Sequence, residues 1–314
     1  MESVVLMYHF INDDNSNFSN LKGISTNQFY EQLKVLLKKY RPISHEEILK
    51  STQLDKFPEN TFYLTFDDGT KDHSNNVLPI IKDLGLTASF FPVPQPLIDG
   101  VVPIIEKQRF LQYIGYEKYS DFLNVFCSEI LKRVPKGKRS VFINSKENIE
   151  KSSTYLKHLT YYNNKERFYR KIRDLFLDSL IFEEIINNLF SKFYSDEISF
   201  IDNFYMSFND LKLLISEGMT LGAHTYSHSL LSKLSDEECK NEIVESIDIL
   251  QQKLLCKIES FAYPNGVRTQ VAESILKSSM IKYSFGVGNL KANPKVNRFN
   301  IPRIDAASFE SFLA

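Results

Sequence analysis

Short apolar runs alternate with amphipathic segments near both ends of the 314-residue chain. We expect buried strands at residues 4–10, 62–66, 87–91, 219–223, 258–263, 283–287 and 299–304. Helices between them begin at capping-box sequences such as Ser25-Thr26-Asn27-Gln28 and Ser235-Asp236-Glu237-Glu238. Strands that alternate with helices predict a parallel α/β fold.

The middle of the chain does not follow this alternation. Its apolar residues, among them Phe122, Phe126, Ile172 and Phe182, recur at helical spacing. We therefore expect an α/β barrel built from residues 1–94 and 205–314, with residues 95–204 as a helical insertion that serves as a lid or an interface.

Two segments far apart in the sequence carry the candidate chemistry. Thr65-Phe66-Asp67-Asp68-Gly69 supplies two adjacent carboxylates at the end of an expected strand. His224-Thr225-Tyr226-Ser227-His228 supplies two imidazoles four residues apart, directly after another expected strand. One Asp with two His is a common ligand set for a catalytic divalent metal that keeps a position open for water. The other Asp would be free to act as the base.

At these two segments the chain resembles the NodB-type polysaccharide deacetylases, which are the carbohydrate esterases of family 4. Thr-Phe-Asp-Asp-Gly matches their first motif and His-Thr-x-x-His their second. The resemblance covers roughly residues 1–92 and 205–305, and it implies a distorted, incomplete (β/α)7 barrel. It also implies that Asp68, His224 and His228 bind a divalent metal and that Asp67 is the general base. Zinc is the default metal, and the ligand set also accommodates cobalt, nickel or manganese.

The third family motif departs from its usual form, which is close to Arg-Pro-Pro-Tyr-Gly. The chain has Phe261-Ala262-Tyr263-Pro264-Asn265-Gly266, as in a Tyr-Pro-x-Gly branch of the family. The resemblance implies that the backbone N–H of Asn265 donates to the oxyanion of the reaction. Because Ala262 stands where the family has Arg, we expect Arg303 to orient the base, with Arg268 as the second choice.

The general acid is not evident, because no histidine follows His228. His9, at the end of the first expected strand, should lie near the same barrel mouth and is our candidate for the acid or for a substrate contact. A structural role for His9 is the alternative. Asp67 could also return the proton to the leaving nitrogen itself.

Net charge and the distribution of apolar residues limit the kinds of binding partner and the location that we expect. The chain has 38 Lys and Arg against 39 Asp and Glu, so no overall field attracts nucleic acid. No stretch is long and apolar enough to span a bilayer, and the first residues do not resemble a signal peptide. We therefore expect a cytoplasmic protein. The sequence does not indicate its oligomeric state.

The expected function is metal-dependent hydrolysis of an N-acetyl or N-formyl amide on an acylated amino sugar. A cytoplasmic enzyme would act on a nucleotide- or lipid-linked intermediate of surface glycan synthesis. Two alternatives remain open at this point. One is a catalytically silent barrel that binds glycans, and the other is an amide hydrolase that acts on a non-sugar metabolite.

Overall fold

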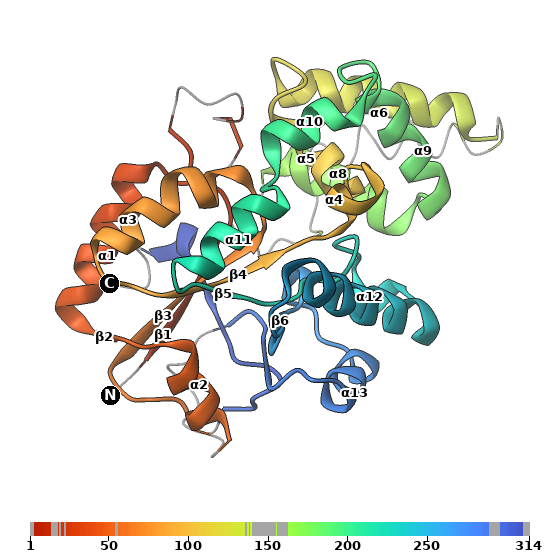
Figure 1. The fold of residues 1–314 in the computed structure, drawn as a ribbon. Helices are drawn as coiled ribbons and strands as arrows, with labels where there is room; N and C mark the ends of the chain where they lie inside the picture. The colour runs from red at the N-terminus through yellow and green to blue at the C-terminus, as the bar shows by residue number, and fades with distance from the viewer. Residues whose placement is uncertain are drawn as a thin grey trace. The chain divides into compact units, whose positions relative to one another are not determined.

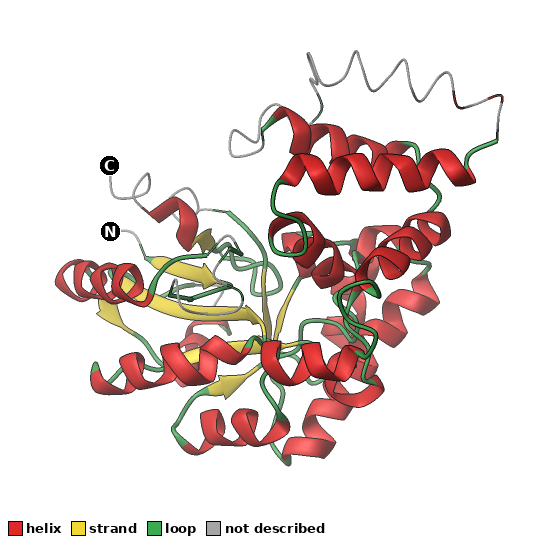
Figure 2. Cartoon of the chain, turned by 90° about the horizontal axis from the view of Figure 1, so that it is seen from above, coloured by secondary structure: helices red, strands yellow, loops and turns green. Residues whose placement is uncertain are grey.

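The computed structural model describes residues 3–13, 18, 20, 21, 23–53, 56–135, 137, 139, 155, 163–288 and 296–309. The chain forms two compact units (Figures 1 and 2). The first comprises Met1–Pro103 together with Ile198–Ala314, and the second is Ile104–Glu197. The first unit contains the strands, and the second is helical in its described residues.

The first unit is built on parallel strands. In chain order they are β1 (Val4–Tyr8), β2 (Arg41–Pro42), β3 (Thr61–Asp68), β4 (Ala88–Pro92), β5 (Thr220–Leu221), β6 (Ser260–Ala262), β7 (Tyr283–Phe285) and β8 (Ile304–Asp305). One sheet has the order β5-β4-β3-β1-β8, with β2 paired to the start of β3, and β6 and β7 form a second sheet. All of these pairings are parallel, which confirms the expected parallel α/β fold.

The two sheets meet through single bridges rather than through long ladders. Ala223 bridges Phe261 beyond β5, and Phe285 bridges Ile301 ahead of β8. The strands therefore form a barrel that is not closed by continuous hydrogen-bonded strand pairs. The last strand, expected at residues 299–304, is shorter than predicted, because only Ile304 and Asp305 pair with β1.

Alternation along each strand separates the inside of the barrel from its outside. On β3, Phe62, Leu64 and Phe66 belong to the core under the surrounding helices, whereas Tyr63 belongs to a second cluster with Phe91 and Phe285. That second cluster fills the barrel interior. The side of β3 that carries Tyr63 also carries Thr65 and Asp67, so the strand directs one of its two carboxylates inward.

The first unit also contains the helices that connect its strands, most of which lie beside the strands in Figure 1. They are α1 (Thr26–Lys39), α2 (His45–Thr52), α3 (Leu78–Asp83), α4 (Gln95–Asp99), α10 (Glu197–Phe204, whose first residue lies in the second unit), α11 (Phe208–Ser216), α12 (Asp236–Leu254) and α13 (Gln270–Ser278). The expected capping boxes at Ser25 and Ser235 are both formed. A π-helical turn, His73–Val77, directly precedes α3 in the segment that follows β3.

The second unit packs four described helices around aromatic side chains. They are α5 (Ile104–Tyr113), α6 (Tyr119–Arg133), α8 (Asn164–Leu175) and α9 (Ser179–Phe190). Phe122 and Phe126 on α6 contact Tyr169 on α8 at centroid distances of 5.4 and 4.9 Å. The helical character expected for the insertion is therefore present in its described part, while residues 140–154 and 156–162 lie outside that part. Within the described ranges, no helix combines the length and apolarity needed to cross a membrane.

Candidate metal centre and its surroundings

Asp67 points into the barrel and forms a two-point ion pair with Arg303. Both guanidinium nitrogens, Nη1 and Nη2, donate to the carboxylate oxygens at 2.7 Å. Arg303 also donates to the hydroxyl of Thr65 at 3.1 Å and to the carbonyl of Gly286 at 3.2 Å. Its guanidinium lies over the rings of Phe91 and Phe285. Arg303 is fully buried, so these contacts hold the Asp67 carboxylate in one orientation.

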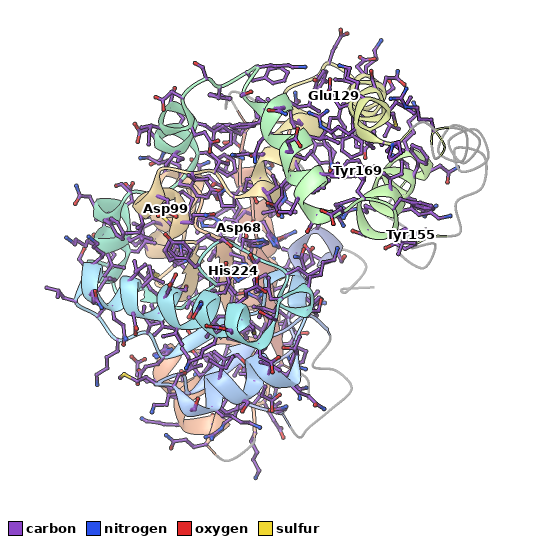
Figure 3. All side chains as sticks on the ribbon, turned by 90° about the vertical axis from the view of Figure 1, so that its right-hand side faces the viewer. Asp68, Asp99, Glu129, Tyr155, Tyr169 and His224 are labelled. Carbon is purple, nitrogen blue, oxygen red and sulfur yellow. The ribbon has the colours of Figure 1, made fainter. Side chains whose placement is uncertain are left out.

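The side chain of Asp68 points in a different direction from that of Asp67 because of the backbone conformation at the end of β3. Asp68 has a φ of 71° and Gly69 a φ of 75°, so the chain leaves the extended conformation at Asp68. A Cβ on Gly69 would lie 2.8 Å from Pro92, and therefore only glycine fits this turn. The turn directs Asp68 toward the histidines. Figure 3 shows Asp68 beside His224.

The ring of His224 is fixed by the neighbouring strand. Its Nδ1 donates to the carbonyl of Ala262 on β6 at 2.8 Å. This bond leaves Nε2 as the nitrogen with a lone pair, and that atom lies 3.5 Å from Asp68 Oδ1. Ala262 thus contributes its backbone carbonyl to the site.

His228 reaches the same carboxylate from a tight loop. Its Nε2 lies 3.2 Å from Asp68 Oδ1. Thr225 and His228 have φ values of 63° and 60°, a region that costs a non-glycine residue about 1–3 kcal/mol. The loop must therefore be held by other contacts.

Glu242 on α12 provides those contacts. Its carboxylate accepts hydrogen bonds from the backbone N–H groups of Tyr226 and Ser227, both at 2.9 Å. The hydroxyls of Ser227 and Ser229 also donate to it. One carboxylate thus satisfies four donors of the loop that carries His228. Sequence reasoning missed Glu242, because nothing in the local pattern of α12 distinguishes it from other half-buried helix residues.

Asp68, His224 and His228 together fit a divalent metal. One ligand atom from each residue lies within 4.8 Å of the others, and all three side chains are buried. The separations of 3.5 and 3.2 Å from Oδ1 to the two Nε2 atoms are close to the edge of about 3.3 Å expected for a tetrahedral zinc site with bonds of about 2.0–2.1 Å. The donor set and its spacing therefore suit zinc.

The charges around Asp67 keep it ionised. Burial alone would raise its pKa, but the positive charge of Arg303, the neighbouring His224 and the hydrogen bonds from Arg303 outweigh burial and lower the pKa below its usual value. For His224, burial works toward a lower pKa, whereas Asp67 and Asp68 raise it, and the net shift is upward. The pKa of Asp67 is lowered by its positive neighbours, whereas the raised pKa of His224 reflects the two carboxylates beside it.

The remaining expected site residues lie at strand ends or beyond the site. His9 follows β1 and is close enough to Asp67 for its charge to lower the pKa of that carboxyl. Asn265 lies in the turn after β6 with a φ of 55°. Arg268 forms an ion pair with Glu273 on α13, so Arg303, and not Arg268, contacts Asp67. His73 is buried, and its Nε2 bonds the His9 carbonyl at 2.6 Å.

Residues 55–108 and 200–284 match the sequence profile of the polysaccharide deacetylase family. The barrel is a NodB-type polysaccharide deacetylase domain. Enzymes of this family hydrolyse N-acetyl amide bonds with the help of a metal, and the deacetylase domain belongs to this hydrolase class. No curated protein sequence matches the chain significantly.

Solved structures agree with the deacetylase fold. The Streptococcus pyogenes deacetylase PplD in complex with acetate is similar over all of this chain and 97% of its own, with 17% identity and a TM-score of 0.57. IcaB from Ammonifex degensii is similar over 99% and 95% of the two chains, with 16% identity and a TM-score of 0.57. At these identities the likeness concerns the fold, and it confirms the expected distorted barrel.

Proposed function

We propose that the protein removes an acetyl or formyl group from the nitrogen of an amino sugar by metal-dependent hydrolysis. The observation that carries the proposal is the buried Asp68, His224 and His228 set beside a second carboxylate, Asp67, which Arg303 keeps ionised and oriented. A buried ligand set with a separate, oriented carboxylate beside it is the arrangement that metal-assisted hydrolysis requires.

In the proposed reaction, water adds to the amide carbon, the C–N bond breaks, and acetate or formate and a free amine result. A divalent metal held by the three ligands would lower the pKa of that water and polarise the amide carbonyl. Asp67 takes the proton from the attacking water. The backbone N–H of Asn265 donates to the oxyanion, and His9 protonates the departing nitrogen.

A second part of the proposal concerns the group to which the amino sugar is attached. We propose a nucleotide- or lipid-linked amino sugar, which is an intermediate of surface glycan synthesis and bears phosphate. The choice is motivated by the basic residues of α8 in the second unit, which are Arg167, Arg170, Lys171 and Arg173; Arg173 also pairs with Asp174. Guanidinium groups are suited to phosphate.

Metal analysis combined with acyl release tests the proposal. Zinc-loaded wild type, Asp67→Asn and Asp68→Asn would be incubated with nucleotide-linked N-acetyl sugars, lipid-linked sugars and N-acetylglucosamine oligomers, and released acetate or formate would be quantified. We expect wild type to bind metal and turn over, Asp67→Asn to keep the metal and lose turnover, and Asp68→Asn to lose both.

Other outcomes would favour the alternatives. A wild type that binds glycan and releases no acyl group from any substrate would favour the silent barrel. Release confined to non-sugar amides would favour the metabolite hydrolase. Folded wild-type protein that does not retain metal would refute the mechanism.

A further inference from the structure

The chain leaves its hydrogen-bonded strand pairing at the end of β1, directly before His9. Within the described residues, β1 pairs with β3 no further than Tyr8 opposite Phe66, whereas β3 continues beside β4. Backbone hydrogen bonds to Ile24 hold one side of the chain after β1. The peptide groups on its other side have lost their strand partner, and buried peptide groups need one.

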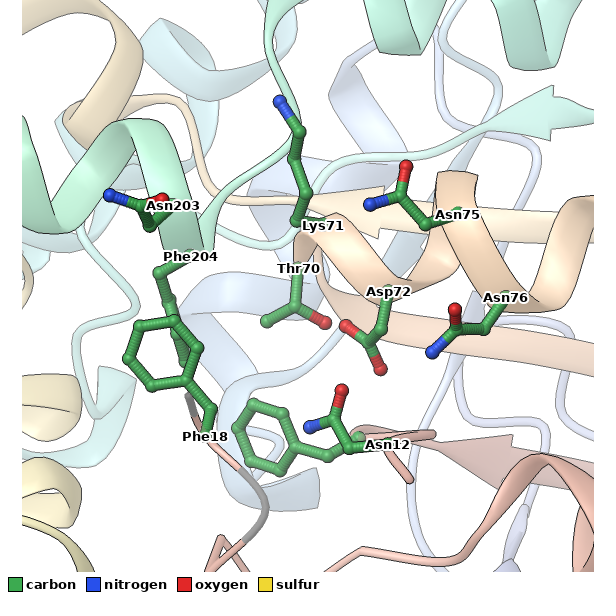
Figure 4. Close-up of a pocket in the computed structure, with 10 residues that line it drawn as sticks. Asn12, Phe18, Thr70, Lys71, Asp72, Asn75, Asn76, Asn203 and Phe204 are labelled. Atoms are coloured by element: carbon green, nitrogen blue, oxygen red, sulfur yellow. The ribbon is translucent and has the colours of Figure 1, made fainter. Parts of the chain in front are cut away.

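Side chains at the π-helical turn after β3 bond those peptide groups. His73 Nε2 lies 2.6 Å from the carbonyl oxygen of His9. Asp72 Oδ2 accepts a hydrogen bond from the backbone N–H of Ile11 at 2.5 Å, and Asn76 Nδ2 donates to the Ile11 carbonyl at 2.7 Å. Figure 4, which draws the pocket beside this turn, shows Asp72 and Asn76 extending toward the chain after β1. Three side chains thus replace the strand pairing that β1 loses at its end.

The buried imidazole of His73 is better explained by this contact than by packing. Its ring is fully buried and lies edge-on to Phe66, with centroids 5.4 Å apart. A carbonyl oxygen only accepts, so Nε2 carries the proton that bonds His9. In the neutral ring Nδ1 then has a lone pair, which finds no hydrogen-bond partner among the residues that the structure describes. A buried nitrogen without a partner weakens folding, and an apolar side chain could fill the same place without that cost.

We propose that His73 is a positioning residue for His9, and that it acts by fixing the backbone from which the His9 side chain extends. One short segment would then set two groups of the reaction, because it carries Asp67 at its start and His73 after the turn at Gly69. π-Helical turns are frequent at functional sites, and this one brings His73 to the end of β1. The inference rests on the proposed function, in which His9 protonates the leaving nitrogen, and adds a residue that acts through His9.

Turnover in two backgrounds tests the proposal. Acyl release from N-acetylglucosamine oligomers and nucleotide-linked N-acetyl sugars would be measured with zinc-loaded protein. We expect His73→Leu to lower kcat by about 10–100-fold and to leave KM unchanged, since a displacement of about 1 Å has effects of that size. His73→Gln, whose amide can donate to the same carbonyl, should retain most of the wild-type kcat. In a His9→Asn background, His73→Leu should cause no further loss. The same loss in both backgrounds would overturn the proposal.

Matched controls separate positioning from a general loss of stability. His45 is also bonded through its ring, since Nδ1 lies 2.6 Å from the hydroxyl of Tyr283 at the start of β7. His45→Leu should lower the unfolding temperature and leave kcat unchanged.

A milder pair of variants keeps the test available if His73→Leu does not fold. Asn76→Ala removes one bond to Ile11 and should lower kcat by about 2–10-fold, the effect of one hydrogen bond. Asn75→Ala, at the exposed neighbouring position, should leave kcat unchanged. Equal kcat values for the two variants would contradict the proposal.

A measurement without substrate separates this inference from the proposed function. Ring NMR signals would be recorded from zinc-loaded, ¹⁵N-histidine-labelled protein, with the His9 signal assigned by its absence from His9→Asn. A single sharp His9 signal in wild type and His73→Gln, shifted or broadened in His73→Leu, would support the positioning role even if no acyl group is released. Acyl release in which His73→Leu changes neither kcat nor the His9 signal would overturn the inference and keep the deacetylase.

Discussion

Arg303 and Asp67 form a buried two-point ion pair inside the barrel, with both N–O distances at 2.7 Å. The arginine comes from the chain ahead of β8 and the carboxylate from the end of β3. The resemblance implied that the arginine of the family's third motif is missing at Ala262, and an arginine from the chain ahead of β8 lies against the proposed base. The loss of that motif arginine therefore does not leave Asp67 without a guanidinium partner.

Replacing Arg303 should destabilise the protein strongly. Arg303→Ala leaves the Asp67 carboxylate buried without its counter-ion, which costs about 3–5 kcal/mol in the free energy of unfolding. Arg268→Ala is the matched control, because the Arg268 side chain is 37% exposed and its pair with Glu273 should contribute no more than about 1 kcal/mol. Urea denaturation of the metal-free proteins measures both. Equal losses for the two variants would contradict a special role for the buried pair.

The same pair should make stability depend on acid pH. The pKa of Asp67 is lowered on folding, because Arg303 and His224 outweigh the effect of burial. A carboxyl with a lowered folded pKa contributes stability above its unfolded pKa, about 3.9, and that contribution is lost as the pH falls through the folded pKa. We expect the advantage of metal-free wild type over Asp67→Asn to be constant near neutrality and to shrink below about pH 4. Denaturant titrations from pH 2 to 7 measure it, and an advantage that grows in acid would refute the assignment.

Glu242 should affect metal affinity indirectly, because it binds the loop that carries His228 and not the side chains of the proposed metal ligands. Glu242→Ala removes the acceptor of four hydrogen bonds from residues 226–229 and frees the strained loop that carries His228. Loss of such supporting contacts weakens metal binding by about 10–100-fold. Zinc competition with a chromogenic chelator measures the affinity. Glu245→Gln, one turn further along α12, is the control and should bind zinc like wild type.

His9 should affect turnover and leave metal content unchanged. If it protonates the leaving nitrogen, His9→Asn lowers kcat by about 10²–10⁴-fold. A rise in KM alone would instead make His9 a substrate contact. Unchanged kinetics would leave His9 with a structural role and would favour Asp67 as the group that returns the proton.

Local patterns account for the parts of the fold that the sequence predicted. The helix starts at Ser25 and Ser235 follow from capping boxes whose members are three residues apart, and strand burial follows from short apolar runs. The grouping of Asp68 with His224 and His228 came from two motifs whose spacing and strand-end positions are visible in the chain. The π-helical turn at His73–Val77 was not predicted, because its hydrogen bonds leave no distinct local pattern.

By itself, the sequence determined the parallel α/β alternation, the helical character of the insertion and the three residues of the candidate metal site. Each of these depends on residues that are near in sequence or that end strands of the same parallel sheet. The sequence placed Arg303 ahead of Arg268 as the partner of Asp67, and the tertiary structure decided between them, since Arg303 contacts Asp67 and Arg268 pairs with Glu273. It also decided that Glu242 holds the His228 loop. Such contacts form when segments that are distant in the sequence pack together. The arrangement of the strands in the barrel, and not local propensity, decides which side chains meet in its interior.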